Sequence, residues 1–192
     1  MKNPIKICVV AAVLLTVFSL HSNAQTSASK TESYGSGIRL SVGADGGVPV
    51  GSLNTAYNWS LGGSVQGDFP ILKDQLYATF NAGYNNIFAS NQYSNNLPDI
   101  HLIPLKAGLK YFVIKQVYVQ GEAGVSILTN KNNLGADKST VFVYAPQAGV
   151  LLNVGGKNYI DAGFRFESNQ KFFDGGTTSN FLALRVAYAF NL

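Results

Sequence analysis

Apolar and polar residues alternate strictly in the last part of the chain, from Asn180 to Leu192. Every second position is large and apolar: Leu182, Leu184, Val186, Tyr188, Phe190 and Leu192. The positions between them are mostly small or polar and include Arg185. Such alternation predicts a β-strand whose two faces meet different surroundings. A soluble protein buries the apolar face, whereas a membrane barrel turns it to lipid and lines a narrow lumen with the other.

Seven earlier segments alternate in the same way, and most are longer than the five or six residues of a typical globular strand. With the last, the eight segments are Gly37–Val48, Tyr57–Phe69, Leu76–Phe88, Ile100–Phe112, Val117–Leu128, Val141–Val154, Asn158–Glu167 and Asn180–Leu192. About ten tilted residues rise roughly 25 Å, the height of the apolar band of a membrane barrel. The pattern predicts an all-β fold over residues 37–192, an eight-stranded antiparallel up-and-down transmembrane β-barrel.

The links between these segments alternate in length. The short links are 70–75, 113–116 and 155–157, and the longer, polar links are 49–56, 89–99, 129–140 and 168–179. Short periplasmic turns and longer outer loops are typical of bacterial barrels. We therefore expect both ends of the barrel domain to face the periplasm.

The first 24 residues have the pattern of a secretory signal peptide. Lys2 and Lys6 precede an apolar run from Ile7 to Leu20, and Ser22-Asn23-Ala24 supplies small residues for cleavage after Ala24. A retained anchor helix is the alternative, but the run is shorter than the roughly 20 residues that a spanning helix needs. Residues 25–36 are polar and rich in serine and threonine, which predicts a flexible periplasmic segment.

Loss of the leader changes the composition in two ways. The formal charge of +4 loses Lys2 and Lys6 and becomes +2, which provides no basic patch for nucleic acid. The single cysteine, Cys8, leaves as well, so disulfides and thiol chemistry are excluded from the mature chain. Charged residues make up 12% of the chain, against about 25% in soluble domains. These features favour a β-barrel in the bacterial outer membrane over a soluble sandwich or a soluble lipocalin-like barrel.

The ionisable residues of the predicted strands share the face opposite the large apolar side chains. They are Arg39, Asp45, Asp68, Lys106, Lys110, Glu122, Asp161, Arg165, Glu167 and Arg185. Five cations and five anions in a narrow lumen predict a plug of paired charges, because an unpaired buried charge is costly. We expect Glu122, Arg165 and Arg185 at its middle. A proton or ion path through the same residues is the alternative.

Aromatic residues gather near the predicted strand ends, as in the girdles at the two membrane interfaces. The outer girdle would hold Trp59, Tyr84, Tyr144 and Phe166, and the inner one Phe69, Tyr111, Tyr118, Tyr159, Tyr188 and Phe190. Ordinary core aromatics are the alternative interpretation. We expect Tyr93, Phe172 and Phe173 to be exposed in the outer loops, where they would bind a surface ligand or fold onto the rim.

The sequence offers little for catalysis. A lipid A deacylase of the barrel type uses a His-x-Ser pair and a glutamate, but the mature chain has one histidine, His101, and Ile103 stands where that serine would be. Without a second base or a cysteine, neither acid–base catalysis nor a metal site is indicated. Turn chemistry accounts for Asp137 and Asp174. We expect no enzymatic activity, no cofactor and no bound metal.

Four stretches carry a resemblance to a known family: GVPVGSLNTAYNWSLGGSV at 47–65, IPLKAGLKYF at 103–112, VYVQGEAGVSI at 117–127 and NFLALRVAYAFNL at 180–192. Over residues 37–192 the chain resembles small outer-membrane barrels of the OmpX type and the transmembrane half of OmpA. It is most similar to stand-alone barrel-domain proteins of Bacteroidetes-type bacteria. Family members often end on an aromatic residue, whereas this chain ends on Leu192, two residues after Phe190.

The resemblance implies an outer-membrane protein with a structural or surface-interaction role. Its expected partners are outer-membrane lipid or lipopolysaccharide, and the barrel-assembly machinery through the C-terminal strand. No nucleic-acid partner is expected, and the sequence identifies no surface ligand. Three alternatives stay open: a narrow channel or transporter for small or hydrophobic molecules, a lipid A-modifying enzyme, and an accessory of a secretion machine.

Overall fold

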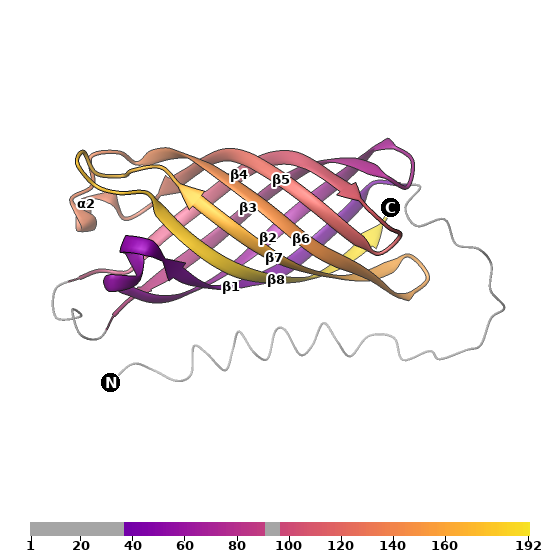
Figure 1. Cartoon of the computed structure of the whole chain (residues 1–192), viewed down its shortest axis with the longest axis horizontal. Helices are drawn as coiled ribbons and strands as arrows, with labels where there is room; N and C mark the ends of the chain where they lie inside the picture. Colours follow the sequence, from indigo (N-terminus) through magenta and orange to yellow (C-terminus); the bar gives the residue numbers. More distant parts are fainter. Residues whose placement is uncertain (1–36, 91–96) are drawn as a thin grey trace. The chain divides into compact units, whose positions relative to one another are not determined.

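The computed structural model describes residues 37–90 and 97–192, which form a closed antiparallel β-barrel (Figure 1). Its strands are β1 (Arg39–Val50), β2 (Tyr57–Leu72), β3 (Leu76–Ala89), β4 (Ile100–Phe112), β5 (Val117–Leu128), β6 (Thr140–Gly155), β7 (Asn158–Asn169) and β8 (Ser179–Asn191). Each strand pairs with its neighbour in sequence, and β1 pairs with β8 to close the barrel. The predicted eight-stranded up-and-down barrel is thereby confirmed.

Two segments of the sequence prediction, the leader 1–24 and the polar segment 25–36, lie outside the described residues. Two short helices lie in the links, η1 (Gly51–Thr55) and α2 (Lys131–Leu134). Neither of these two helices, the only ones in the described part of the chain, has the length and apolar content needed to cross a membrane.

Several strand ends differ from the predicted ones by one to three residues, and two of these differences have a clear physical reason. β2 continues through Pro70, which pairs with Tyr77, and an irregularity in the register follows between Pro70 and Leu72. Proline is tolerated at such irregularities, so the predicted link 70–75 is shortened to residues 73–75. β7 extends to Asn169, because Ser168 and Asn169 are buried and pair with Asn180 and Ser179 of β8 instead of forming a solvated loop.

The links divide between the two ends of the barrel. The turns 73–75, 113–116 and 156–157 lie at what we call the short-turn end. The links 51–56, 129–139 and 170–178 lie at the long-loop end, which α2 marks in Figure 1, together with the described residues of the link 90–99. Gly156 has a φ of 56°, which allows the two-residue turn between β6 and β7.

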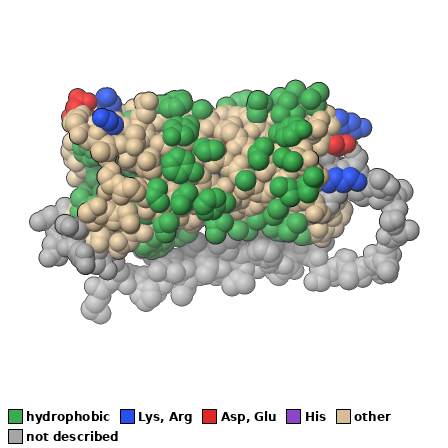
Figure 2. Space-filling model, in the orientation of Figure 1, with side chains coloured by type: hydrophobic (Ala, Val, Ile, Leu, Met, Phe, Trp, Pro, Cys, Tyr) green, Lys and Arg blue, Asp and Glu red, His purple; other side chains and the backbone are tan. Residues whose placement is uncertain are grey.

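The polarity of the barrel is the reverse of that of a soluble protein. In β8, Leu184 is 61% exposed and Val186 55%, whereas Arg185 between them is fully buried. On the face shown in Figure 2, charged side chains lie at the two ends and apolar side chains cover the wall between them. Apolar residues therefore face outward and ionic residues face the lumen, which excludes a sandwich with an apolar core.

Small residues allow the strands to approach one another around the narrow lumen. Gly43 of β1 pairs with Ala187 of β8, and a Cβ atom on Gly43 would lie 2.6 Å from that of Ala187. Ala187 and Ala189 are both buried. A side chain at Gly43 would collide with β8, and the buried alanines leave little space for larger side chains.

Two clusters of buried apolar side chains close the barrel at its ends. The long-loop cluster consists of Tyr57, Ile87, Ile100, Leu102, Leu128, Ala136, Val141, Phe172 and Phe181. The short-turn cluster consists of Tyr77, Phe112, Tyr118, Leu151, Tyr159 and Ala189. The polar part of the lumen thus lies between two apolar layers.

Substitution of Ala187 by leucine tests the packing of the lumen. We expect Ala187→Leu to lower the free energy of unfolding by about 1–3 kcal/mol, because the added carbons have no space inside the barrel. Val186→Leu, at the next position but on the exposed outer wall, is the control and should change it by less than about 0.5 kcal/mol. Urea unfolding in detergent micelles measures both, and equal effects would contradict the assigned faces.

Candidate functional site

The lumen holds the largest concentration of ionisable groups among the described residues. All ten of the side chains predicted to face it are buried, with exposed fractions of 5% or less. They form two groups of ion pairs. The central group comprises Asp45, Lys106, Glu122, Arg165 and Glu167, and the short-turn group comprises Arg39, Asp68, Lys110, Asp161 and Arg185.

The central group contains two cations and three anions. Lys106 Nζ donates to Glu167 Oε2 at 2.5 Å and lies 4.0 Å from Glu122 Oε2. Arg165 reaches two carboxylates, with NH1 3.3 Å from Asp45 Oδ1 and NH2 3.7 Å from Glu122 Oε2. Each cation is therefore shared between two carboxylates, and the formal charge of the group is −1.

The short-turn group has an excess of positive charge. Lys110 Nζ lies between Asp68 and Asp161, at 2.8 and 3.1 Å from their Oδ2 atoms. Arg39 NH1 is 3.7 Å from Asp68, and Arg185 NH1 is 3.8 Å from Asp161. Three cations and two anions give this group a formal charge of +1. The ten residues together are neutral, as the desolvation cost of buried charge requires.

Uncharged side chains join the two groups. Ser64 Oγ donates to Asp45 at 2.6 Å and accepts from Arg185 Nε at 3.0 Å. A second bridge begins at Arg165, whose Nε donates to the Gln147 side chain at 2.9 Å. Gln147 donates to the Tyr118 hydroxyl at 2.7 Å, and Tyr118 donates to Asp161 at 2.5 Å. Hydrogen bonds and ion pairs thus connect the ionic lumen into one network.

Of the three residues predicted to form the middle of this network, the structure brings two into direct contact. Arg165 contacts Glu122 directly. Arg185 belongs to the other group and reaches the central one through Ser64 and Asp45. Sequence reasoning missed Ser64 and Gln147 as bridging residues, although both occupy inward-facing positions of their strands.

Arg39 closes the short-turn side of the network. Its guanidinium carbon lies 5.3, 5.7 and 5.2 Å from the ring centroids of Tyr77, Phe112 and Tyr159. Ring faces attract a cation most strongly where water is excluded, which is the case around this buried arginine. The aromatic layer at this end therefore also stabilises charge.

Two residues of the predicted aromatic girdle are placed wrongly by the sequence analysis. Tyr118 and Tyr159 are 0% and 2% exposed and lie in the lumen. Tyr118 alternates in phase with Gln120, and Tyr159 with Asp161, so strand geometry turns both inward. The other girdle residues lie on the outer wall, Phe166 and Phe190 half-buried and the rest exposed: Trp59, Phe69, Tyr84, Tyr111, Tyr144, Tyr188, Phe166 and Phe190.

The loop aromatics have three different outcomes. Phe172 is not exposed as predicted: it is 4% exposed and belongs to the long-loop cluster, which agrees with the alternative that these aromatics fold onto the rim. Its carbonyl accepts the N–H groups of Asp137 and Lys138, at 3.1 and 3.0 Å, so two loops hold it in place over the apolar layer. Phe173 is exposed. Tyr93 lies outside the described residues.

His101 is part of the barrel rim and not of the ionic lumen. Its Nδ1 atom lies 2.5 Å from the Tyr84 hydroxyl. The two loop aspartates are engaged locally, since Asp137 Oδ2 accepts the backbone N–H of Asp174 at 2.7 Å. Within residues 37–90 and 97–192, no cluster of three or more His, Cys, Asp or Glu residues is arranged to hold a metal ion.

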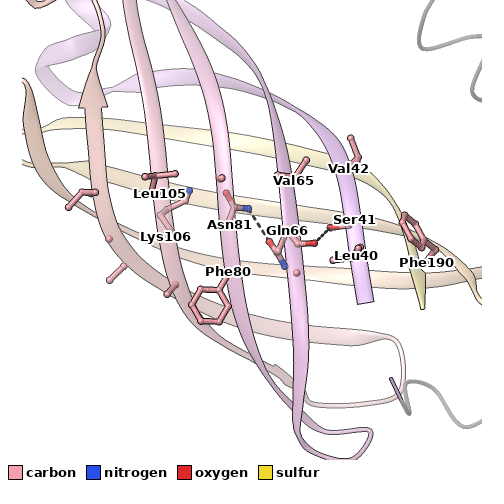
Figure 3. A pocket seen from close by; sticks show the side chains of 16 residues that line it. Leu40, Ser41, Val42, Val65, Gln66, Phe80, Asn81, Leu105, Lys106 and Phe190 are labelled. Carbon is pink, nitrogen blue, oxygen red and sulfur yellow. Dashed lines mark hydrogen bonds between the residues drawn. The ribbon is translucent and has the colours of Figure 1, made fainter. Parts of the chain in front are cut away.

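A groove of about 660 Å³ runs over the wall formed by β1 to β5 (Figure 3). The exposed residues that line it are apolar, among them Val42, Val65 and Phe80. Gln66 and Lys106 also line it but are buried. The groove therefore presents hydrocarbon to its surroundings and belongs to the outer wall.

A smaller pocket of about 240 Å³ lies at the long-loop end, above the long-loop cluster. It is lined by Ser52, Leu53, Ala56, Tyr57, Ile100, Leu128, Leu134, Phe172, Phe173, Gly176, Thr177, Thr178 and Ser179. Its walls come from three long links that contact one another, for example through a 2.6 Å hydrogen bond between the Ser52 and Thr177 hydroxyls. No charged side chain occurs among these lining residues.

Comparisons with solved structures give the same fold. The chain is similar to neisserial surface protein A (TM-score 0.54, 17% identity, 82% of this chain and 98% of that one). It is also similar to the outer membrane protein AlkL (TM-score 0.51, 14% identity, 88% of this chain and 97% of that one). A third similar structure is the outer membrane protein OprG of Pseudomonas aeruginosa (TM-score 0.51, 10% identity, 81% of this chain and 96% of that one). At these identities the likeness establishes the fold alone. No protein-family model and no curated protein sequence matches the chain.

Removal of Lys106 tests the balance of the buried network. We expect Lys106→Met to lower the free energy of unfolding by about 3–5 kcal/mol, because Glu167 then remains buried without its cation. Adding Glu167→Gln should recover part of this loss. Lys138→Met, which breaks the exposed pair with Asp174, should cost about 0–1 kcal/mol. Urea unfolding in micelles measures all three, and additive effects of the two lumen substitutions would contradict the pairing.

Proposed function

We propose that the chain is an integral β-barrel protein of the bacterial outer membrane with a structural or surface-interaction role and no catalytic activity. The observation that carries this proposal is the reversed polarity of the barrel, with an apolar outer wall and an ionic lumen. The wall suits the hydrocarbon interior of a bilayer. The similar outer-membrane barrels support the same location.

The filled lumen favours this role over that of a channel. Ten ionisable side chains occupy its middle, paired at distances of 2.5 to 4.0 Å. Apolar clusters close it on both sides. A solute or ion crossing this lumen would have to separate buried ion pairs, each of which is costly to break. The paired charges thus act as structural filling.

The lengths of the links determine the proposed orientation of the barrel in the membrane. In a bacterial barrel the long loops face the cell exterior and the short turns the periplasm. In this orientation the outer wall contacts lipid and lipopolysaccharide, and the C-terminal strand β8 is the segment that the barrel-assembly machinery recognises. The leader 1–24 directs export and is removed.

The pocket at the long-loop end supports a more specific surface interaction, the binding of a small neutral molecule. Its floor is apolar, and the hydroxyl groups of Ser52 and Thr177 lie among its lining. Hydrogen bonds between the loops hold its walls in place, and such preorganisation lowers the cost of binding. An aromatic or aliphatic molecule with one hydroxyl group matches this lining in size and polarity.

Conductance measurements test the closed lumen. We expect the purified full-length protein, reconstituted in planar bilayers, to give no discrete openings, because the paired side chains and apolar layers fill its cross-section. Protection of the strands from added protease shows independently that the barrel has inserted. Openings in the native protein that vanish in Arg165→Ala or Glu122→Gln would contradict the proposal and favour the channel.

Filling the long-loop pocket tests the surface interaction. We expect 4-fluorophenol to bind saturably to the barrel in nanodiscs, with ¹⁹F NMR as the readout and empty nanodiscs as the reference. Leu53→Trp should weaken binding about tenfold or more, because the indole ring occupies the pocket. Asn54→Trp, on the exposed side of the same short helix, should leave it unchanged. Equal binding by both variants would contradict a site in this pocket.

A further inference from the structure

The three short turns share a pattern that the lumen and the pocket do not use. Each turn carries one lysine close to exposed apolar residues. Lys73 follows Ile71 and Leu72, Lys115 follows Val113 and Ile114, and Lys157 follows Val154 across a glycine pair. We call this set of lysines and apolar residues the basic collar.

The collar is spaced around the barrel. Its turns join β2 to β3, β4 to β5 and β6 to β7, which are alternate pairs of neighbouring strands in a closed sheet. All three lysines are exposed, and they form no ion pair within residues 37–90 and 97–192. Asp74 is the one acidic residue in these turns, so their formal charge is +2.

The long-loop end does not share this excess. Its links carry Lys131, Lys138 and Lys171 together with Asp99, Asp137 and Asp174, so that their formal charges cancel. Two of these lysines are also engaged, Lys138 with Asp174 at 3.6 Å and Lys131 with the carbonyl of Asp137 at 2.9 Å. The positive charge is therefore specific to the short-turn end.

We propose that the basic collar binds the headgroups of anionic phospholipids in the leaflet at the short-turn end, an inference that rests on the proposed membrane location. The apolar residues of each turn place the edge of the hydrocarbon layer at the base of the turn. The neighbouring ammonium groups then reach the headgroup level, where a lysine attracts anionic lipid. A soluble polyanion would use the lysines alone and would leave the adjoining apolar side chains exposed to water.

The test measures the lipid selectivity of the reconstituted full-length barrel. Spin-labelled phosphatidylglycerol and phosphatidylcholine are compared in phosphatidylcholine vesicles, and the motionally restricted fraction gives their relative association constants. We expect a preference for phosphatidylglycerol of about two- to fivefold at low salt. It should fall toward one in 0.5 M NaCl, because salt screens exposed charges.

Matched triple variants locate the preference. Lys73→Gln, Lys115→Gln and Lys157→Gln together should abolish it, whereas arginine at the same three positions should retain it. Lys131→Gln, Lys138→Gln and Lys171→Gln together, at the long-loop end, should leave it unchanged. A native preference near one, or an equal loss in both glutamine variants, would overturn the proposal. If neither lipid showed a restricted fraction, the barrel would not be in the bilayer, and the proposed membrane location itself would fail.

Discussion

The width of an eight-stranded barrel is the constraint on which the rest of this structure depends. Eight strands enclose a lumen that side chains can just fill, so no bulk water remains there to solvate a charge. The residues that face the lumen are therefore either small, like Gly43 and Ala187, or packed closely against other side chains. The ionic network and the close approach of the strands are two consequences of the same narrow cross-section.

The ionic network also specifies the register of the strands. A shift of one residue along a strand would move its whole set of inward side chains to the outer wall. For β7 such a shift would place Asp161, Arg165 and Glu167 against hydrocarbon. Lys106 and Lys110 would each lose one of their two carboxylate partners. Buried ion pairs add little net stability, but a buried charge without a partner, or a charge turned toward hydrocarbon, costs far more. Their role is thus to make one pairing of strands much more favourable than any other.

Alternation in the sequence was sufficient to predict the strands and the residues inside the barrel, because it depends on local geometry with a period of two. It was not sufficient for the contacts among them. Lys106 and Glu167 meet across the lumen from strands that are not neighbours, and their meeting depends on the stagger of the whole sheet. Tyr118 and Tyr159 were assigned to the aromatic girdle because aromatic residues gather near strand ends. The alternation of their strands turns both side chains into the lumen instead. Phe172 lies in a loop, where no period indicates burial.

The distribution of charge along the barrel distinguishes its two ends. The lumen is neutral as a whole, but its short-turn group has a formal charge of +1 and lies nearest the turns that carry Lys73, Lys115 and Lys157. Like charges at one end repel, and the apolar layer between them screens this repulsion less well than water does. Among the described residues, the short turns contain only Asp74 to offset it. The formal charge of −1 in the central group offsets part of this repulsion, and anionic surroundings of the short turns would offset more of it.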